Sequence, residues 1–287
     1  MTKWKMIVCP FNPQQYRHCM MNDEEFLEKG LYQLIKGNPI YKYRPFSRGE
    51  EMLDKQEFYL SKPSDFNDPF DCYGGLICFD ASKKFLDQEI IEKLPNKLVL
   101  GSRTQRRRYE REVLKEKEKL CSEYFNSRRD RIGICCFSWD CENIVMWAHY
   151  ADNHKGICLG FKYIEPIRKD IYGIYPVDYT SDIETYHFSS FDDEYYWRHW
   201  LCTKSNAWEY EKEARMIFKE YNGKVKFPKE ILNDIYLGYS TSKEDEQRVR
   251  ELLIEHDYPK TVKLYKMTID NSKFILVPKE IKWCKSK

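Results

Sequence analysis

The segment from Trp208 to Phe218 constrains the fold most strongly, because charged and apolar side chains alternate along it. Successive side chains of a β-strand point to opposite faces of a sheet, so this alternation predicts a strand with two unlike faces. One face would carry Ala214, Met216 and Phe218, and the other Glu211, Glu213 and Arg215. A row of charges on one sheet face is unfavourable unless water, a cation or a ligand screens it. We therefore expect the charged face to border solvent or a cleft.

Short patterned segments along the rest of the chain predict a single α+β domain, with a mixed, largely antiparallel sheet and flanking helices. The predicted strands cover residues 40–44, 58–60, 131–138, 156–161, 235–238, 262–269 and 274–277. Predicted helices cover residues 22–37, 48–56, 143–152, 243–256 and a segment centred on 194–200. We interpret residues 1–40 as an N-terminal helical extension, residues 41–287 as the domain, and the polar stretch at about 81–130 as an inserted basic helical segment.

The inserted segment holds the main local excess of positive charge. The whole chain has a formal net charge of only +2, so its global field does not attract nucleic acid. Between Arg103 and Arg131, however, 11 Lys or Arg residues stand against 6 Asp or Glu residues. Such a run is either a solvated helix face or a phosphate-binding surface. In the second case the nucleic-acid contacts would come from Arg103, Arg106, Arg107, Arg108, Arg128 and Arg129.

The cysteines and the apolar runs bear on where the protein resides. The 11 cysteines are scattered, and residues 1–17 contain no apolar run long enough for a secretory leader. A reducing cytoplasm is therefore expected, and no metal site is assigned to cysteine because the spacing of zinc ligands is missing. No stretch of roughly 18 residues is uniformly apolar, so we expect no membrane-spanning segment.

Two strings are the most specific motifs. Residues 66–71 read FNDPFD, a composition typical of a stiff turn. Residues 146–156 read MWAHYADNHKG, in which Trp147 and Tyr150 would share one face of a helix. Core packing is the ordinary explanation of such a face, and a lone histidine such as His154 ordinarily bonds the terminal carbonyls of a helix.

These strings, together with others in the same order, resemble the bacterial and phage family called domain of unknown function 2971. The blocks that carry the resemblance are YKYR at residues 41–44, FNDPFD at 66–71, CFS at 136–138, the run 146–161, Lys204 and the run 208–215. The family name implies no activity. The resemblance does suggest a toxin or phage-defence setting.

A more distant resemblance is to ADP-ribosyltransferases, which present an early basic strand, a strand with an aromatic and a hydroxyl residue, and a late strand with Glu-x-Glu. Arg44, then Phe137 with Ser138, then Glu211 with Glu213, follow this order. The resemblance implies an ADP-ribosyltransferase-like fold with NAD as the substrate. It also implies either transfer of ADP-ribose to an unknown protein or nucleic-acid acceptor, or cleavage of NAD.

The same resemblance implies a role for each matching residue. Glu213 would stabilise the oxocarbenium-like ribose as nicotinamide leaves, Glu211 would orient the acceptor, and Ser138 would support the strand of Glu213. Asn67 and Asp68 would contact the substrate. Phosphates would lie at Lys42 and Arg44, nicotinamide would stack on Trp147 or Tyr150, and the remaining NAD-binding residues would be Tyr43, Phe137, His154 and Lys204.

Two other functions stay open from the residues alone. A magnesium-dependent nuclease would use Asp68 or Asp71 with Glu211 and Glu213 as oxygen ligands, and would place Lys204 near the scissile phosphate. A non-catalytic module would use the FNDPFD loop and the aromatic helix as a pocket for a peptide or a nucleotide. Such a module would tolerate replacement of both glutamates by glutamine.

Overall fold

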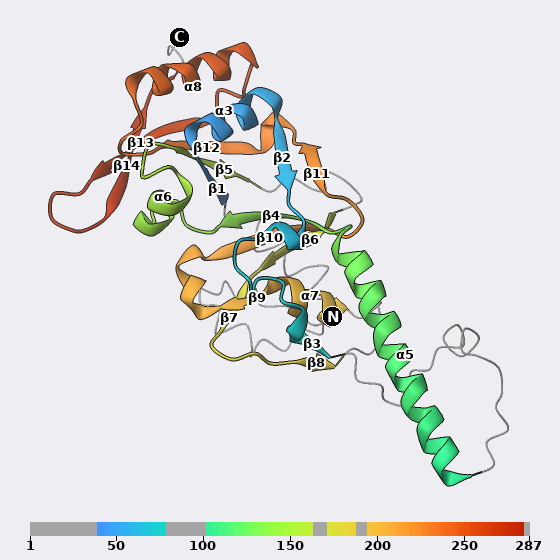
Figure 1. Cartoon of the computed structure of the whole chain (residues 1–287). Coiled ribbons are helices and arrows are strands. Elements are labelled where there is room, and N and C mark those ends of the chain that lie inside the picture. The colour runs from blue at the N-terminus through green and yellow to red at the C-terminus, as the bar shows by residue number, and fades with distance from the viewer. Residues whose placement is uncertain (1–38, 79–101, 163–170, 188–193, 284–287) are drawn as a thin grey trace, which may run out of the picture.

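The computed structural model describes residues 39–78, 102–162, 171–187 and 194–283. The predicted helix at 22–37, almost all of the predicted extension, and the first part of the predicted insertion lie outside these ranges. The central element is an eight-stranded sheet in the order β14-β13-β12-β5-β1-β4-β10-β6 (Figure 1). Its strands are β1 (Ile40–Arg44), β4 (Gly133–Ser138), β5 (Ile157–Phe161), β6 (Ile171–Pro176), β10 (Glu213–Phe218), β12 (Leu232–Leu237), β13 (Lys263–Ile269) and β14 (Leu276–Ile281).

The pairing of these strands confirms the predicted fold class. Neighbours β12 and β13 run parallel, and the other neighbouring pairs of this sheet are antiparallel. The helix α8 (Lys243–Glu255) connects the two parallel strands, as a parallel pair requires. The protein is therefore an α+β protein with a mixed, largely antiparallel sheet.

Helices cover both faces of the sheet because buried apolar side chains project from both of them. On one face, side chains of α8 and α3 (Phe46–Lys55) share the largest core cluster with Ala214, Met216 and Phe218. On the other face, α7 (Glu194–Cys202) packs over Ile217, and α6 (Ile144–Tyr150) packs in a third cluster nearer β12. Figure 1 shows α3 and α8 together at one side of the sheet and α6 and α7 at the other.

The strand β10 confirms part of the predicted alternation and corrects one point. Glu213 and Arg215 do share the face opposite Ala214, but Glu211 is the last residue of the 3₁₀ helix η6 (Asn206–Glu211) and not part of the strand. Lys212 between them has a left-handed backbone with φ of 44°, which turns the chain and breaks the alternation. The charged side chains are buried, where opposite charges screen one another, and Glu211 and Glu213 border a cavity, which is the second of the two surroundings expected for this face.

Within the described ranges, three small two-stranded sheets and several short helices flank the central sheet. The pairs are β2 (Glu57–Leu60) with β11 (Gly223–Lys226), β3 (Ile77–Cys78) with β8 (Tyr186–His187), and β7 (Asp178–Thr180) with β9 (Thr203–Ser205). The short 3₁₀ helices are η3 (Pro63–Asp65), η4 (Gly74–Leu76) and η7 (Lys229–Ile231). Strand β9 matters most for the site, because it carries Lys204.

The second part of the predicted insertion is a single long helix, α5 (Arg103–Arg129), which projects from the body of the protein (Figure 1). A capping box begins it, because the Ser102 side chain accepts a hydrogen bond from the backbone of Gln105 and the Gln105 side chain accepts one in return. At its other end the Phe125 ring packs 4.2 Å from the Trp200 ring and anchors the helix to α7. None of the described helices is long and apolar enough to cross a membrane.

Candidate functional site

A cavity lies where the central sheet splits between β1 and β4. These strands pair at Tyr41 and Ser138, and beyond that point their ladder ends. The ammonium group of Lys42 donates a hydrogen bond to the backbone carbonyl of Cys136. This carbonyl of β4 is therefore bonded to a side chain of β1 where the backbone ladder has ended. The cavity has a volume of about 220 Å³ and is lined by residues of β1, β4, α6, η6 and the FNDPFD loop.

A buried arginine organises the charges behind this cavity. Arg215 is 0% exposed, and its guanidinium makes two paired contacts with carboxylates. Its Nε and Nη2 atoms lie 2.8 and 3.0 Å from the two carboxylate oxygens of Glu213. Its Nη1 and Nη2 atoms lie 2.7 and 2.8 Å from the oxygens of Asp71, and Nη1 also donates to the carbonyl of Leu201 at 2.6 Å. The planar fork of arginine suits such bidentate contacts, so Arg215 fixes both carboxylates.

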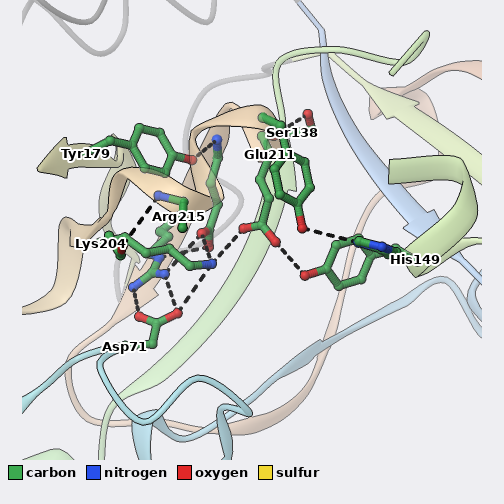
Figure 2. Close-up of polar contacts among 12 residues, drawn as sticks. Asp71, Ser138, His149, Tyr179, Lys204, Glu211 and Arg215 are labelled. Carbon is green, nitrogen blue, oxygen red and sulfur yellow. Dashed lines mark hydrogen bonds and ion pairs between the residues drawn. The ribbon is translucent and has the colours of Figure 1, made fainter. Parts of the chain in front are cut away.

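Lys204 joins a third carboxylate to this cluster (Figure 2). Its ammonium nitrogen lies 2.6 Å from Glu211, 3.1 Å from Glu213 and 3.6 Å from Asp71. We call these five side chains, Asp71, Lys204, Glu211, Glu213 and Arg215, the charge cluster. Three carboxylates face two cations, and all five side chains are less than a tenth exposed.

Burial and charge act differently on the titration of the cluster. Burial alone would raise the pKa of Glu213, but Arg215 and Lys204 outweigh it and hold this pKa well below its usual range. Burial would lower the pKa of Lys204, and the carboxylates, Glu213 first, raise it instead. For Glu211 burial prevails and raises the pKa, although Lys204 favours the ionised form. Glu211 therefore takes up a proton more readily than Glu213 does.

Hydrogen bonds from three elements hold Glu211 and Glu213 in place. The Tyr150 hydroxyl on α6 donates to the Glu211 carboxylate, and the Ser138 hydroxyl on β4 donates to the Glu211 backbone carbonyl at 2.7 Å. The Tyr179 hydroxyl on β7 accepts from the backbone N–H of Glu213 at 2.8 Å. Ser138 thus fixes the backbone of the glutamate segment.

The structure brings most of the predicted site residues to one cavity. Ten of them line its wall: Lys42, Tyr43, Arg44, Asn67, Phe137, Ser138, Tyr150, Lys204, Glu211 and Glu213. They come from segments of the chain that are far apart in sequence. This shared location is a necessary condition for a common site, and their proposed roles remain predictions.

Three predicted residues lie elsewhere, so their placement at the site is corrected. Trp147 is 0% exposed, and its indole N–H donates to the carbonyl of Cys141, which makes it a core residue. Asp68 does not line the cavity, and its carboxylate accepts a hydrogen bond from the backbone of Phe70 within the turn. His154 borders a different cavity, beside the loop between β13 and β14.

Sequence reasoning missed several members of the site. Asp71 was considered only as a metal ligand, yet it completes the charge cluster from a position 144 residues before Arg215. Phe66 lies with its ring 5.4 Å from the Arg215 guanidinium, and Tyr41, Tyr59 and Cys136 also line the cavity. Asp71 and Phe66 both belong to the FNDPFD string, so the string itself was the available signal.

The arrangement of charges bears on the magnesium-dependent alternative. Among the described residues, no group of three or more His, Cys, Asp or Glu side chains has the geometry to hold a metal ion. Asp71, Glu211 and Glu213 do converge, but Lys204 and Arg215 lie between them and occupy their oxygens. The carboxylates therefore form ion pairs in which cationic side chains take the place a metal would need.

Comparison with known proteins adds one match. Residues 146–216 match the family described as Protein of unknown function (DUF2971), which supports the resemblance noted from the motifs over this part of the chain. The matched region contains most of α6, all of β9 and η6, and most of β10, and hence Tyr150 and all of the charge cluster except Asp71. No curated protein and no solved structure matches the chain.

Proposed function

We propose that this cavity binds NAD and that the protein breaks its nicotinamide glycosidic bond, with transfer of ADP-ribose to an acceptor or to water. The observation that carries the proposal is the position of Glu211. Its carboxylate lines the cavity, held by Tyr150 and Lys204, while Lys42 and Arg44 line the same cavity from β1. A carboxylate and two cations bordering one small space suit a ligand that has both a developing positive charge and phosphates.

The proposed reaction needs only placed charges. The bond between ribose C1′ and the nicotinamide nitrogen breaks, and its electron pair goes to the ring, which leaves as neutral nicotinamide. The oxocarbenium-like ribose that forms is stabilised by the nearby negative charge. A lone pair of the acceptor, or of water, then forms the new bond to C1′, and the acceptor's proton passes to Glu211 or to solvent.

The geometry changes the roles of the two glutamates within this proposal. Both oxygens of Glu213 are bound to Arg215, and one also contacts Lys204, so Glu213 serves to position the cluster. Glu211 holds fewer partners and has the more readily protonated carboxylate, which suits the group that faces the ribose and receives a proton. Glu211 is therefore proposed as the catalytic residue, with Ser138 as a positioning residue.

The test is release of nicotinamide from NAD by purified protein, without added magnesium. The Glu211→Gln variant removes the negative charge and keeps the size of the side chain. Its matched control is Glu209→Gln, on an exposed position of the same 3₁₀ helix. We expect release by the wild type and by the control, and a fall of at least about 100-fold for Glu211→Gln, as for loss of one stabilising group.

Other results would favour the alternatives. Binding of NAD without release of nicotinamide, with equal affinity in Glu211→Gln, would identify a non-catalytic nucleotide-binding module. Absence of both NAD binding and release would contradict the proposal. Cleavage of DNA or RNA that depends on added magnesium would replace it with the nuclease function.

For the acceptor, we propose a nucleic acid contacted by α5. Arg103, Arg107, Arg111 and Lys115 are all exposed and recur every four residues, so neighbouring members lie close on the helix surface. Of the other predicted contacts, Arg108 is exposed and pairs with Glu112, and Arg128 pairs with Glu220. A row of cations on a projecting helix is complementary to a phosphate backbone. A toxin or phage-defence role in the cytoplasm would be compatible with such an acceptor.

A further inference from the structure

A second cavity adjoins the first beside Arg44, the last residue of β1. Its volume is about 340 Å³, and it lies between α3, β2 and β11. Arg44 and Tyr59 line both cavities, so the two spaces meet at these side chains. The first cavity alone is smaller than the roughly 300–1,000 Å³ of typical ligand pockets, whereas the two together fall within that range.

The junction between the cavities is positively charged. Within the described part of the chain, Arg44 makes no ion pair with a carboxylate, and it is close enough to Lys42 to contribute to the lowered pKa of that buried amine, after the larger effect of burial. By contrast, Glu51 in the second cavity is already bound by Arg48 at 3.1 Å and Lys224 at 3.3 Å. Arg44 therefore offers positive charge that no carboxylate of the described residues neutralises, while the Lys42 amine on the wall of the first cavity is bonded to the Cys136 carbonyl.

The second cavity also offers an aromatic face. Tyr59 lies on β2 and is 51% exposed, although its neighbour Phe58 is buried in the core. An exposed tyrosine ring beside a cavity can stack on a nucleobase. Met52 and Phe58 supply the apolar floor of the cavity.

We infer that the two cavities form one bipartite site for a dinucleotide. The nicotinamide riboside half would lie in the first cavity by Glu211, the pyrophosphate at Arg44 and Lys42, and the second nucleoside in the second cavity against Tyr59. The inference rests on the proposed function for the first half only. It selects dinucleotides over nicotinamide mononucleotide and over free nucleosides as the substrate class.

ADP tests the second half on its own, because it carries the pyrophosphate and a nucleoside but no nicotinamide bond. Binding to the whole protein is measured by calorimetry for the wild type, Tyr59→Ala, Tyr59→Phe and Arg44→Gln. Tyr239→Ala is the matched control, since this tyrosine is 48% exposed and lines a different cavity. We expect the dissociation constant to rise at least about tenfold for Tyr59→Ala and Arg44→Gln, and to stay unchanged for Tyr59→Phe and Tyr239→Ala. Absence of ADP binding, or equal binding by Tyr59→Ala, would overturn the inference.

A second measurement separates this inference from the proposed function. Nicotinamide release is measured with NAD and with nicotinamide mononucleotide, and Tyr59→Ala should raise KM for NAD about tenfold without changing KM for the mononucleotide. Release with a KM for NAD that Tyr59→Ala leaves unchanged would overturn the bipartite site and leave the glycosidic function standing. ADP binding that depends on Tyr59, without any release of nicotinamide, would uphold the second cavity and overturn the function.

Discussion

At the scale of single residues, Arg215 has the largest structural role in the site. Its guanidinium is the shared partner of Asp71 and Glu213, and it has no contact with solvent. Replacing it by Met would leave two buried carboxylates with Lys204 as their remaining cation. Removing one partner of a buried ion pair destabilises a protein by about 3–5 kcal/mol. We therefore expect Arg215→Met to lower the free energy of unfolding by about 3–5 kcal/mol.

Urea unfolding at neutral pH measures this difference. The control is Arg108→Met, which removes an exposed pair with Glu112 on α5 and should change stability little. Similar small losses for both variants would mean that the cluster contributes to specificity or chemistry but not to stability. The sequence could not indicate this dependence, because Asp71 and Arg215 are 144 positions apart and only the folded chain joins them.

At the scale of elements, Asn143 couples α6 to η6. Its side-chain oxygen accepts from the backbone of Val145 at 2.9 Å and Met146 at 3.2 Å, which caps α6. Its side-chain nitrogen donates to the carbonyl of Tyr210 at 2.7 Å, next to Glu211. The helix that carries Tyr150 and the segment that carries Glu211 thus share one amide side chain.

Two substitutions of Asn143 distinguish its role as the cap of α6 from its role in joining α6 to η6. Asn143→Asp keeps the acceptor and removes the donor, so we expect α6 to persist while nicotinamide release falls at least several-fold. Asn143→Ala removes both, and we expect the same fall together with a loss of about 1–2 kcal/mol in stability. The control is Ser242→Ala, which removes the side chain that caps α8 by accepting a hydrogen bond from the backbone N–H of Asp245. This variant should lower stability without lowering activity. Full activity in Asn143→Asp would contradict the coupling.

Most elements could be predicted from the sequence, because local patterns determine them. The strands at β1, β4 and β5 and the helices α6 and α8 agree with prediction to within a few residues, since their apolar periods and caps are local signals. Strands β3, β6, β7, β8, β9 and β11 were not predicted. β6 contains Gly173 and ends at Pro176, and β11 is only four residues long, so neither shows a clear alternating pattern.

At the scale of the whole molecule, the proposed contact between the projecting helix α5 and a nucleic acid would make binding sensitive to salt. Reversing three of its exposed cations, as Arg103→Glu, Arg107→Glu and Arg111→Glu together, should weaken binding to RNA or DNA. If each cation neutralises one phosphate, the plot of log K against log salt concentration should become less steep. The magnitude of its slope should decrease by about two to three.

Fluorescence anisotropy with a labelled oligonucleotide at several salt concentrations measures this slope. The control is Lys260→Glu, Lys273→Glu and Lys279→Glu together, which changes the net charge equally at exposed positions away from α5. Equal loss of binding in both triple variants would show that only net charge matters and that α5 is not the contact surface.

The central sheet is held together weakly between β1 and β4. Five strands lie on one side of this boundary and three on the other, and the ladder across it is the single pairing of Tyr41 with Ser138. The proposed ligand would contact β1 through Arg44 and the other group of strands through Glu211. It would therefore link the two parts of the sheet non-covalently. Binding of the ligand in the cavity would then reduce the motion of the two parts of the sheet relative to each other, including strands that do not line the cavity.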